Sequence, residues 1–208
     1  MLTIWGRPNS INVQKVMWAV GELDLDHERI DVGGAFGGLD TDEYGAMNPN
    51  RKIPVLRDDA SAALIWESHA CVRYLAASYG DGTLWPSDPV ARSIADRWMD
   101  WKITTVLPPM HVCFWGLIRT PEADRNMQAI ERAAAELAGI WPLFDRFMQD
   151  RSYVVRDRLT MGDIPLGCAF YRYVNLPIDR PTLPALEAWY ARLQERAPFR
   201  EHVMIPVT

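Results

Sequence analysis

One stretch decides the fold: residues 48–68 read Asn-Pro-Asn-Arg-Lys-Ile-Pro-Val-Leu-Arg-Asp-Asp-Ala-Ser-Ala-Ala-Leu-Ile-Trp-Glu-Ser. Two short apolar runs, Ile53–Leu56 and Ala63–Trp66, flank an acidic turn, and this pattern predicts a β-hairpin. Pro54 has no N–H to donate to a sheet, so it belongs at the first position of a strand or on an edge. The Ile53–Pro54 bond is therefore a candidate cis peptide bond.

A cis bond at Pro54 would turn the backbone N–H and C=O of Ile53 outward, where they could pair with an extended peptide, as in β-strand addition. Glu67 and Ser68 follow the second strand and open a segment with helical periodicity. Ser68 suits a helix N-cap, and a helix N-terminus binds carboxylates readily. The stretch therefore offers backbone for a peptide and, beside it, a pocket for a carboxylate.

The composition is that of a globular protein without a nucleic-acid or membrane partner. The chain has 208 residues, enough for two small domains, and its net charge of −5 argues against phosphate binding as a main role. Cys71, Cys113 and Cys168 are far apart and have no metal-ligand spacing, so we expect no metal and a reducing, cytoplasmic compartment. We also expect no signal peptide, and no apolar run reaches the roughly 18 residues of a membrane-spanning helix.

Within the first 80 residues, segments with the apolar pattern of a β-strand alternate with segments that have the apolar spacing of an α-helix. Residues 2–5 form a short apolar run, residues 12–23 show helical spacing of valine and methionine, and residues 27–32 alternate apolar with charged side chains. A strand, a helix and a strand in this order predict a right-handed βαβ unit with parallel strands. The glycine-rich segment 33–38 is not followed by a helix of the dinucleotide-binding pattern, so we interpret it as a mobile loop. The hairpin follows, and then a helix over 68–79.

After residue 80 strand patterns nearly vanish. Residues 80–89 are rich in glycine, proline and polar side chains, and we place a domain boundary there, with domains at 1–80 and 89–208. Four helical regions are expected beyond it. The first runs over 89–107, with a break or kink at Pro108–Pro109 before a short further helical piece, and the second runs over 121–150, with Thr120 as N-cap and a kink at Pro142. The third begins at a capping box, Thr160–Asp163, and ends at about Asn175. The fourth runs over 184–196.

Four stretches, in this order along both halves of the chain, resemble the glutathione S-transferase family. They are Gly-Arg-Pro-Asn-Ser-Ile-Asn-Val-Gln-Lys-Val from Gly6, Met-Asn-Pro-Asn-Arg-Lys-Ile-Pro-Val-Leu from Met47, Leu-Ile-Trp-Glu-Ser from Leu64, and Leu-Thr-Met-Gly-Asp-Ile-Pro-Leu-Gly from Leu159. The resemblance implies an α/β thioredoxin-like N-terminal domain followed by an all-α C-terminal domain. The details look most like bacterial, theta- or beta-like members.

The resemblance also implies a glutathione site. It maps the residue that pairs with the cysteinyl unit to Ile53, followed by the cis residue Pro54, and it maps the residues that hold the γ-glutamyl end to Glu67 and Ser68. The chemistry agrees, because Glu67 suits an ammonium group and Ser68 at a helix N-terminus suits a carboxylate. Taken alone, this pair could equally well cap a helix. Lys52 or Arg51 could meet the glycine carboxylate, and either could also be a solvated charge.

The family activates the thiol with a hydrogen-bond donor after the first strand, where this chain has no tyrosine or cysteine. Asn9, Ser10 and Asn12 stand there, and Ser10 is the first choice and Asn12 the second for the catalytic donor. A donor to the sulfur favours thiolate over thiol and need not ionise itself. Both residue types are also common helix N-caps.

The electrophile would bind between the domains, against the turn after the first strand and the helices of the second domain. The candidate residues are Arg7, Met110, His111, Phe114 and Trp115. Phe114 and Trp115 also suit plain core positions. Thr160 and Asp163 resemble the family's structural capping box, and Arg156 stands where the family usually has a glycine.

The leading hypothesis is a glutathione transferase, with glutathione as co-substrate and a small hydrophobic electrophile. Isomerisation, reduction or dehalogenation on the same site is a second enzymatic possibility, and a non-catalytic glutathione or ligand carrier is a third, because fold alone does not decide function. Thiol–disulfide reduction by the protein itself is disfavoured, since no cysteine lies in the turn after the first strand. The family is usually homodimeric, and the resemblance implies the same here.

Overall fold

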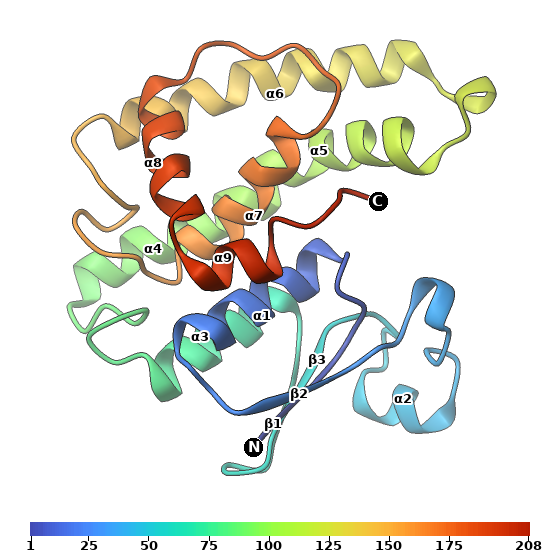
Figure 1. Ribbon diagram of the computed structural model, residues 1–208, viewed down its shortest axis with the longest axis vertical. Coiled ribbons are helices and arrows are strands. Elements are labelled where there is room, and N and C mark those ends of the chain that lie inside the picture. The colour runs from blue at the N-terminus through green and yellow to red at the C-terminus, as the bar shows by residue number, and fades with distance from the viewer.

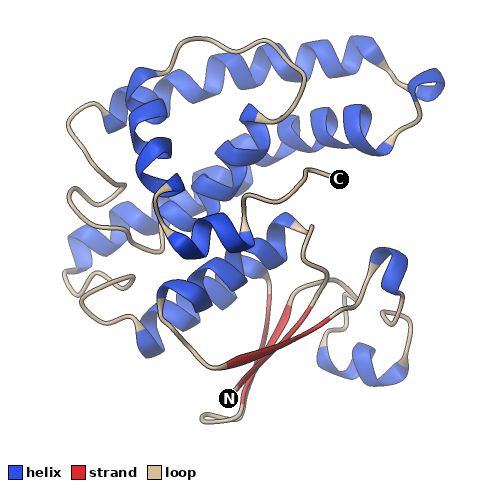
Figure 2. Cartoon of the chain, in the orientation of Figure 1, coloured by secondary structure: helices blue, strands red, loops and turns tan.

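The computed structural model describes residues 1–208, and its first half is built on a four-stranded mixed sheet (Figures 1 and 2). The elements are β1 (Leu2–Trp5), α1 (Ile11–Glu22), β2 (His27–Ile30), β3 (Val55–Asp58), β4 (Ala63–Trp66) and α3 (Ser68–Tyr79). The strand order is β2-β1-β3-β4, with β1 and β2 parallel and the other pairs antiparallel. The predicted βαβ unit, the hairpin and the helix after it are confirmed.

The segment between β2 and β3 has more structure than the loop expected from the sequence. Gly34–Phe36 form a single 3₁₀ turn, and α2 (Asp42–Met47) follows, away from the other helices in Figure 1. Thr41 caps α2, because its side-chain oxygen accepts a hydrogen bond from the N–H of Tyr44. This short helix lacks the apolar period of a longer one, so the sequence pattern did not reveal it.

Helix α1 is the structural centre of the molecule. It packs against α3 on one side and against helices of the second half on the other, and every residue from Val13 to Val20 is buried. Figure 1 shows α1 and α3 between the sheet and the remaining helices. A helix enclosed in this way has no solvated face, so any charged side chain on it must find partners inside the protein.

The second half begins with one long helical run that changes its register twice. α4 (Pro89–Trp101) passes into a π-helical segment, Lys102–Val106, then into α5 (Leu107–Phe114), and then into a second π-helical segment, Trp115–Arg119. Of the break or kink expected at Pro108–Pro109, the break is wrong, because the helical run continues through both prolines. The wider π-helical turn before them accommodates residues that have no N–H and whose rings clash with carbonyls of a regular α-helix.

Helix α6 (Met127–Met148) starts later than the sequence suggested. Its N-cap is Asn126, whose side chain accepts from the N–H of Ala129, whereas the Thr120 hydroxyl donates to the carbonyl of Trp115. Thr120 therefore closes the preceding turn, and the assignment of Thr120 as N-cap is wrong. Pro142 lies inside α6 without ending it.

The remaining helices are α7 (Asp163–Val174), α8 (Pro184–Gln194) and α9 (Ala197–His202). The last of these was missed, because Pro198 reads as a stop signal although proline is well suited to the first turn of a helix. Arg156 has a φ of +59°, the left-handed conformation for which glycine is the usual choice.

Asp163 ties α7 to its surroundings. Its carboxylate is fully buried and accepts hydrogen bonds from the N–H of Val154 (2.9 Å), from the N–H and the hydroxyl of Thr160 (2.9 and 3.1 Å) and from the indole of Trp189 (3.0 Å). The predicted Thr160–Asp163 pair is thus present. The helix N-cap itself is Gly162, so the pair differs from a regular capping box.

Candidate functional site

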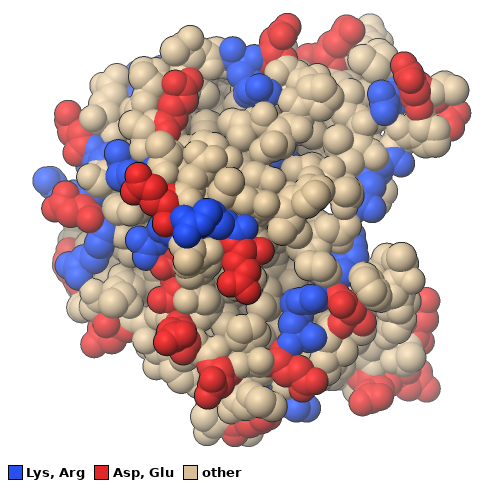
Figure 3. All heavy atoms as spheres, viewed as in Figure 1, with Lys and Arg blue, Asp and Glu red and all other residues tan.

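A cleft of about 500 Å³ separates the β1–α1 turn and the residues before β3 from the helices of the second half. In Figure 3 the molecule is hollowed on its right-hand side, and basic side chains are visible on the walls of the hollow. The first half contributes Arg7, Asn9, Ser10, Asn12, Lys52 and Ile53 to the lining, among others. The second half contributes Lys102, Met110, His111, Phe114, Trp115, Arg119 and Arg172.

The Ile53–Pro54 bond is cis, as the sequence predicted. Pro54 is buried immediately before β3, and Ile53 lines the cleft. Neither the N–H nor the C=O of Ile53 makes a backbone hydrogen bond within the chain. Unpaired backbone groups beside a cleft are available to an extended peptide.

Arg51 and Lys52 are distinguished by their contacts. The guanidinium of Arg51 donates to the carbonyls of Leu39 (2.9 Å) and Thr41 (2.8 Å), so it holds the segment before α2. The ammonium group of Lys52 has no hydrogen-bond or ion-pair partner, and its side chain is exposed beside the cleft. Of the two cations considered for the glycine carboxylate, Lys52 is the uncommitted one.

Glu67 and Ser68 stand at the start of α3, outside the residues that line the cleft wall itself. Glu67, not Ser68, occupies the N-cap position, with a φ of +69° and no side-chain capping bond. The N-terminus of α3 therefore has no side-chain cap, and the interpretation of this pair as mere helix caps loses its basis. A non-glycine residue in the left-handed region is strained, and such strain is concentrated at functional sites.

The two candidate sulfur donors have different environments. Ser10 occupies the N-cap position of α1, but its hydroxyl makes no capping bond and has no partner in the chain. Asn12 is held by its Oδ1 atom, which accepts from Lys15 Nζ (2.9 Å) and from the Ser68 hydroxyl (3.4 Å). Asn9 donates its amide to the Thr208 hydroxyl (2.7 Å). The hydroxyl of Ser10 is thus free to turn, whereas Asn12 is fixed beside Ser68.

Two buried lysines behind the cleft were missed by sequence reasoning. Lys15 on α1 is 2% exposed and also donates to the Ser68 hydroxyl (3.1 Å), and Lys102 from the first π-helical segment is 1% exposed. Burial, reinforced by the neighbouring Lys102, lowers the pKa of Lys15 well below its usual value. Burial likewise lowers the pKa of Lys102 to about 8. No carboxylate pairs with either lysine. At pH 7 Lys102 keeps its positive charge, whereas the lowered pKa of Lys15 favours its neutral amine, so Lys102 carries the positive charge of this wall.

The candidate electrophile residues meet around Phe114. The ring of Phe114 is buried and belongs to the hydrophobic core, yet it also lines the cleft. The side chain of Trp115 is 51% exposed and lies beside His111, with ring centroids 5.6 Å apart. Trp115 is therefore not a plain core residue. Two guanidinium groups cover the Phe114 ring, those of Arg172 at 3.9 Å and Arg119 at 5.5 Å from its centroid.

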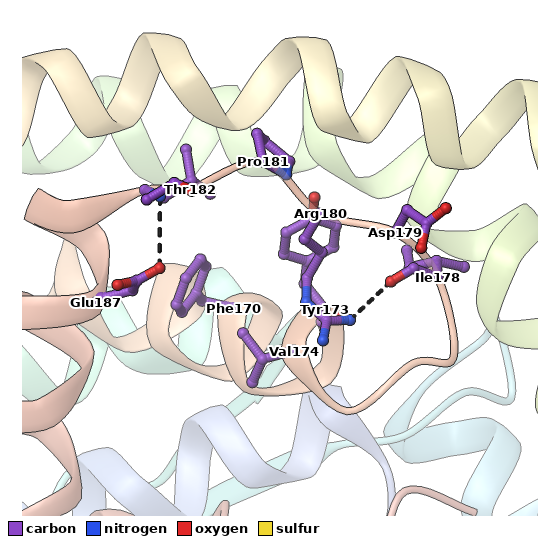
Figure 4. A pocket seen from close by; sticks show the side chains of 10 residues that line it. Phe170, Tyr173, Val174, Ile178, Asp179, Arg180, Pro181, Thr182 and Glu187 are labelled. Carbon is purple, nitrogen blue, oxygen red and sulfur yellow. Dashed lines mark hydrogen bonds between the residues drawn. The ribbon is translucent and has the colours of Figure 1, made fainter.

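A second pocket, of about 340 Å³, lies between α7 and the connection to α8 (Figure 4). Its arginine, Arg180, already donates to the carbonyls of Tyr173, Leu176 and Ile178. Glu187 accepts from the N–H of Leu183. Arg180 and Glu187 thus hold the connection, and Asp179 is the one charged side chain of the lining without a partner in the chain, so this pocket has fewer free charged groups than the first.

No cluster of histidine, cysteine, aspartate or glutamate is arranged to hold a metal ion. None of the helices is long and apolar enough to cross a bilayer. The three cysteines are all buried and unpaired.

Comparisons with known proteins fit this geometry. Residues 9–78 match the family model of the glutathione S-transferase N-terminal domain. Over 208 residues the chain is 39% identical to glutathione S-transferase GstB of Escherichia coli strain K12, and the alignment covers 100% of both chains. The chain belongs to the glutathione S-transferase family. The resemblance inferred from the sequence and the predicted fold class are confirmed.

Other members of the family extend the likeness. A theta class glutathione S-transferase from Xanthomonas axonopodis pv. citri, solved with glutathione bound, has a TM-score of 0.95 and 44% identity, covering 100% of this chain and 99% of that one. Glutathione S-transferase 1 of Manduca sexta is 29% identical over 204 residues, which is 94% of this chain and 88% of the relative. The similarity to family members therefore spans both halves of the chain.

One sequence signal could have revealed part of what was missed. Lys15 stands among the apolar residues of a helix that is expected to be buried, and a lysine in such a place needs partners inside the protein. Lys102, Arg119 and Arg172 give no comparable signal, since each lies in a segment with ordinary charged neighbours.

Proposed function

We propose that this protein is a glutathione transferase that activates the glutathione thiol for attack on a small electrophile. Residues 1–80 would bind glutathione, and residues 89–208 would contribute the electrophile site. The observation that supports the proposal is a cleft lined by the unpaired backbone of Ile53 and the free hydroxyl of Ser10, with the start of α3, which has no side-chain cap, linked to it through the Ser68–Asn12 hydrogen bond. Each suits one part of a γ-glutamyl tripeptide.

The proposed binding mode follows from complementary chemistry. The cysteinyl unit pairs with the Ile53 backbone at the turn before Pro54. Glu67 accepts the α-ammonium of the γ-glutamyl end, and Ser68 with the free N–H groups of α3 binds its carboxylate. Lys52 meets the glycine carboxylate.

The chemistry requires one proton transfer and one substitution. The bound thiol releases its proton to solvent, and the hydroxyl of Ser10 donates a hydrogen bond to the thiolate that remains. The sulfur then forms a bond to the electrophilic carbon, and the leaving group departs with its bonding electrons, as chloride does from a chloroarene. The positive charge of Lys102 would act in the same direction and lower the thiol pKa further. Asn12 is the second candidate for the sulfur contact.

The decisive experiment combines retention and turnover. We expect the protein to bind immobilised glutathione and to conjugate glutathione to 1-chloro-2,4-dinitrobenzene, followed by the absorbance of the thioether. Retention without turnover of this or any other electrophile would favour the carrier function. Turnover restricted to reduction, isomerisation or halide release would identify one of the alternative glutathione-dependent reactions.

The change Lys52→Ala should raise the KM for glutathione about threefold and leave kcat nearly unchanged, because an exposed ion pair contributes under about 1 kcal/mol. Steady-state kinetics measure both constants. A matched substrate sharpens the test: glutathione with its glycine carboxylate converted to an amide should show no change between wild type and variant. An equal loss for both substrates would refute the assignment of Lys52 to the glycine carboxylate.

We further propose a cytoplasmic homodimer, as the family resemblance implies. The three unpaired, buried cysteines support a reducing compartment. Analytical ultracentrifugation gives the oligomeric state, and a monomer at micromolar concentration would contradict the dimer.

A further inference from the structure

Three arginines from distant parts of the chain converge on the electrophile half of the cleft. Arg7 comes from the β1–α1 turn, Arg119 from the second π-helical segment and Arg172 from α7. Arg172 and Arg119 cover the ring of Phe114. The three charges affect one another. Burial lowers the pKa of Arg7, and the nearby charge of Arg119 lowers it further. Burial also lowers the pKa of Arg172, and the charges of Arg119 and Arg7 add to this effect.

No acidic side chain balances this charge. Neither aspartate nor glutamate is among the residues that line the cleft, although the chain as a whole has a net charge of −5. Arg172 is only 8% exposed, and its guanidinium has no ion pair and no hydrogen bond within the chain. The nearby thiol of Cys168 is no counter-charge, because burial raises its pKa to about 12 and it stays neutral at pH 7.

The other two arginines leave donors available as well. The guanidinium of Arg7 has no hydrogen-bond partner within the chain, and Arg119 uses one nitrogen to donate to the backbone oxygen of Thr208. A buried cation without a partner is costly, and its usual compensation is an anion. A guanidinium presents a planar fork of N–H donors that matches a carboxylate.

We propose that the electrophile of this enzyme is an aromatic acid, whose carboxylate binds Arg172 and Arg7 while its ring lies against Trp115. The inference rests on the proposed glutathione transferase function and names the substrate class of that site. In the proposed binding mode the two carboxylates of glutathione are met by Lys52 and the start of α3. The arginines around Phe114 therefore remain for the second substrate, which would be anionic instead of merely hydrophobic.

A matched pair of chloroarenes tests the proposal. 4-Chloro-3-nitrobenzoate and 4-chloro-3-nitrobenzamide differ in charge but hardly in shape, and each kcat/KM is divided by the rate constant of the uncatalysed reaction with glutathione. We expect the wild type to favour the benzoate by about tenfold, the size of one charge-assisted hydrogen bond. Arg172→Met should remove most of this preference by raising the KM for the benzoate, with little change for the benzamide.

The control variant is Arg97→Met. Arg97 on α4 also lies over a phenylalanine ring, that of Phe147 at 5.6 Å, but it does not line the cleft. It should leave the preference unchanged. If Arg172→Met does not fold, Arg119→Met serves instead, because the side chain of Arg119 is exposed and its loss should shift the preference in the same direction.

The outcomes separate this inference from the proposed function. Conjugation of both chloroarenes with no preference for the benzoate would overturn the anionic substrate and leave the transferase function standing. Equal losses with both in Arg172→Met would also overturn it, since the arginine would then act on the thiolate. If neither chloroarene reacts, calorimetric affinities of the two ready-made glutathione conjugates still decide, and equal affinities would refute the proposal.

Discussion

Replacing Ser10 by alanine should raise the pKa of the glutathione thiol in the complex by about one to two units. A hydrogen bond to a charged group contributes about 1.5–3 kcal/mol, and one pKa unit corresponds to about 1.4 kcal/mol. Ser10 is placed to make such a bond because its hydroxyl is free at the start of α1. The thiolate fraction at about pH 6.5 would fall accordingly, and kcat/KM with it, by about ten- to a hundredfold.

The pH dependence gives this prediction its signature. The loss should be largest below the thiol pKa of the wild-type complex and should vanish above the raised pKa of the variant, where both enzymes carry thiolate. Ultraviolet absorbance of the thiolate in the binary complex measures the pKa directly. A loss of rate that persists unchanged at high pH would show that Ser10 acts in another way.

Asn12→Ala is the comparison variant. Lys15 and Ser68 hold Asn12 beside the start of α3, where we propose that the γ-glutamyl end binds. We therefore expect the Asn12→Ala change to weaken glutathione binding more than it moves the thiol pKa. If only Asn12→Ala moves the pKa, Asn12 is the sulfur donor. If neither variant moves it, both assignments are wrong.

Asp163→Ala should have the largest effect on stability, lowering the free energy of unfolding by about 3–5 kcal/mol. The carboxylate accepts four hydrogen bonds, and its removal leaves the N–H groups of Val154 and Thr160 and the indole of Trp189 without that acceptor in the interior. Urea unfolding at about pH 7.5 measures the change. Burial raises the pKa of Asp163 to about 6, so the carboxylate is ionised under these conditions.

Asp145→Ala supplies the matched control for stability. Asp145 is also a buried carboxylate, but it accepts a single hydrogen bond, from the N–H of Leu186 at 3.0 Å. We expect about 1–2 kcal/mol for its loss. If the two variants are equally destabilised, the hydrogen bonds of Asp163 are not what holds the start of α7.

Much of the first half could be predicted because its signals are local. The hairpin is encoded by two apolar runs around an acidic turn, and the position of Pro54 before a strand pointed to the cis bond that the structure contains. The sequence predicted correctly that α3 starts at Ser68, but it did not predict that Glu67 occupies the N-cap position. The φ angle of Glu67 depends on how β4 and α3 join, and this is not encoded in the local pattern. Local pattern thus located the proposed glutathione cradle but not its detailed geometry.

The charge of the cleft could not be predicted in the same way. Lys15, Lys102 and Arg172 come from three different helices, and only the packing of α1 between the sheet and the second half brings them together. Lys102 and Arg172 are ordinary residues in their own segments, and the apolar neighbours of Lys15 indicate only that it is buried, not which residues surround it. The helical run through Pro108 was also misjudged, because the π-helical turn that accommodates the prolines is a property of the packed helix and has no sequence pattern of its own.

The π-helical segments on either side of α5 would make the proposed electrophile surface adjustable by changes in length. In each, the backbone hydrogen bond spans five residues instead of the four of an α-helix, and Lys102, Trp115 and Arg119 lie within these segments. Deleting one residue from such a turn would restore the α-helical hydrogen-bond pattern and change which side chains of the segment face the cleft. A single codon lost or gained could therefore exchange the side chains that face the second substrate while the glutathione half of the cleft stays as it is. Variation in helix length is thus a route by which relatives of this protein could acquire different electrophiles.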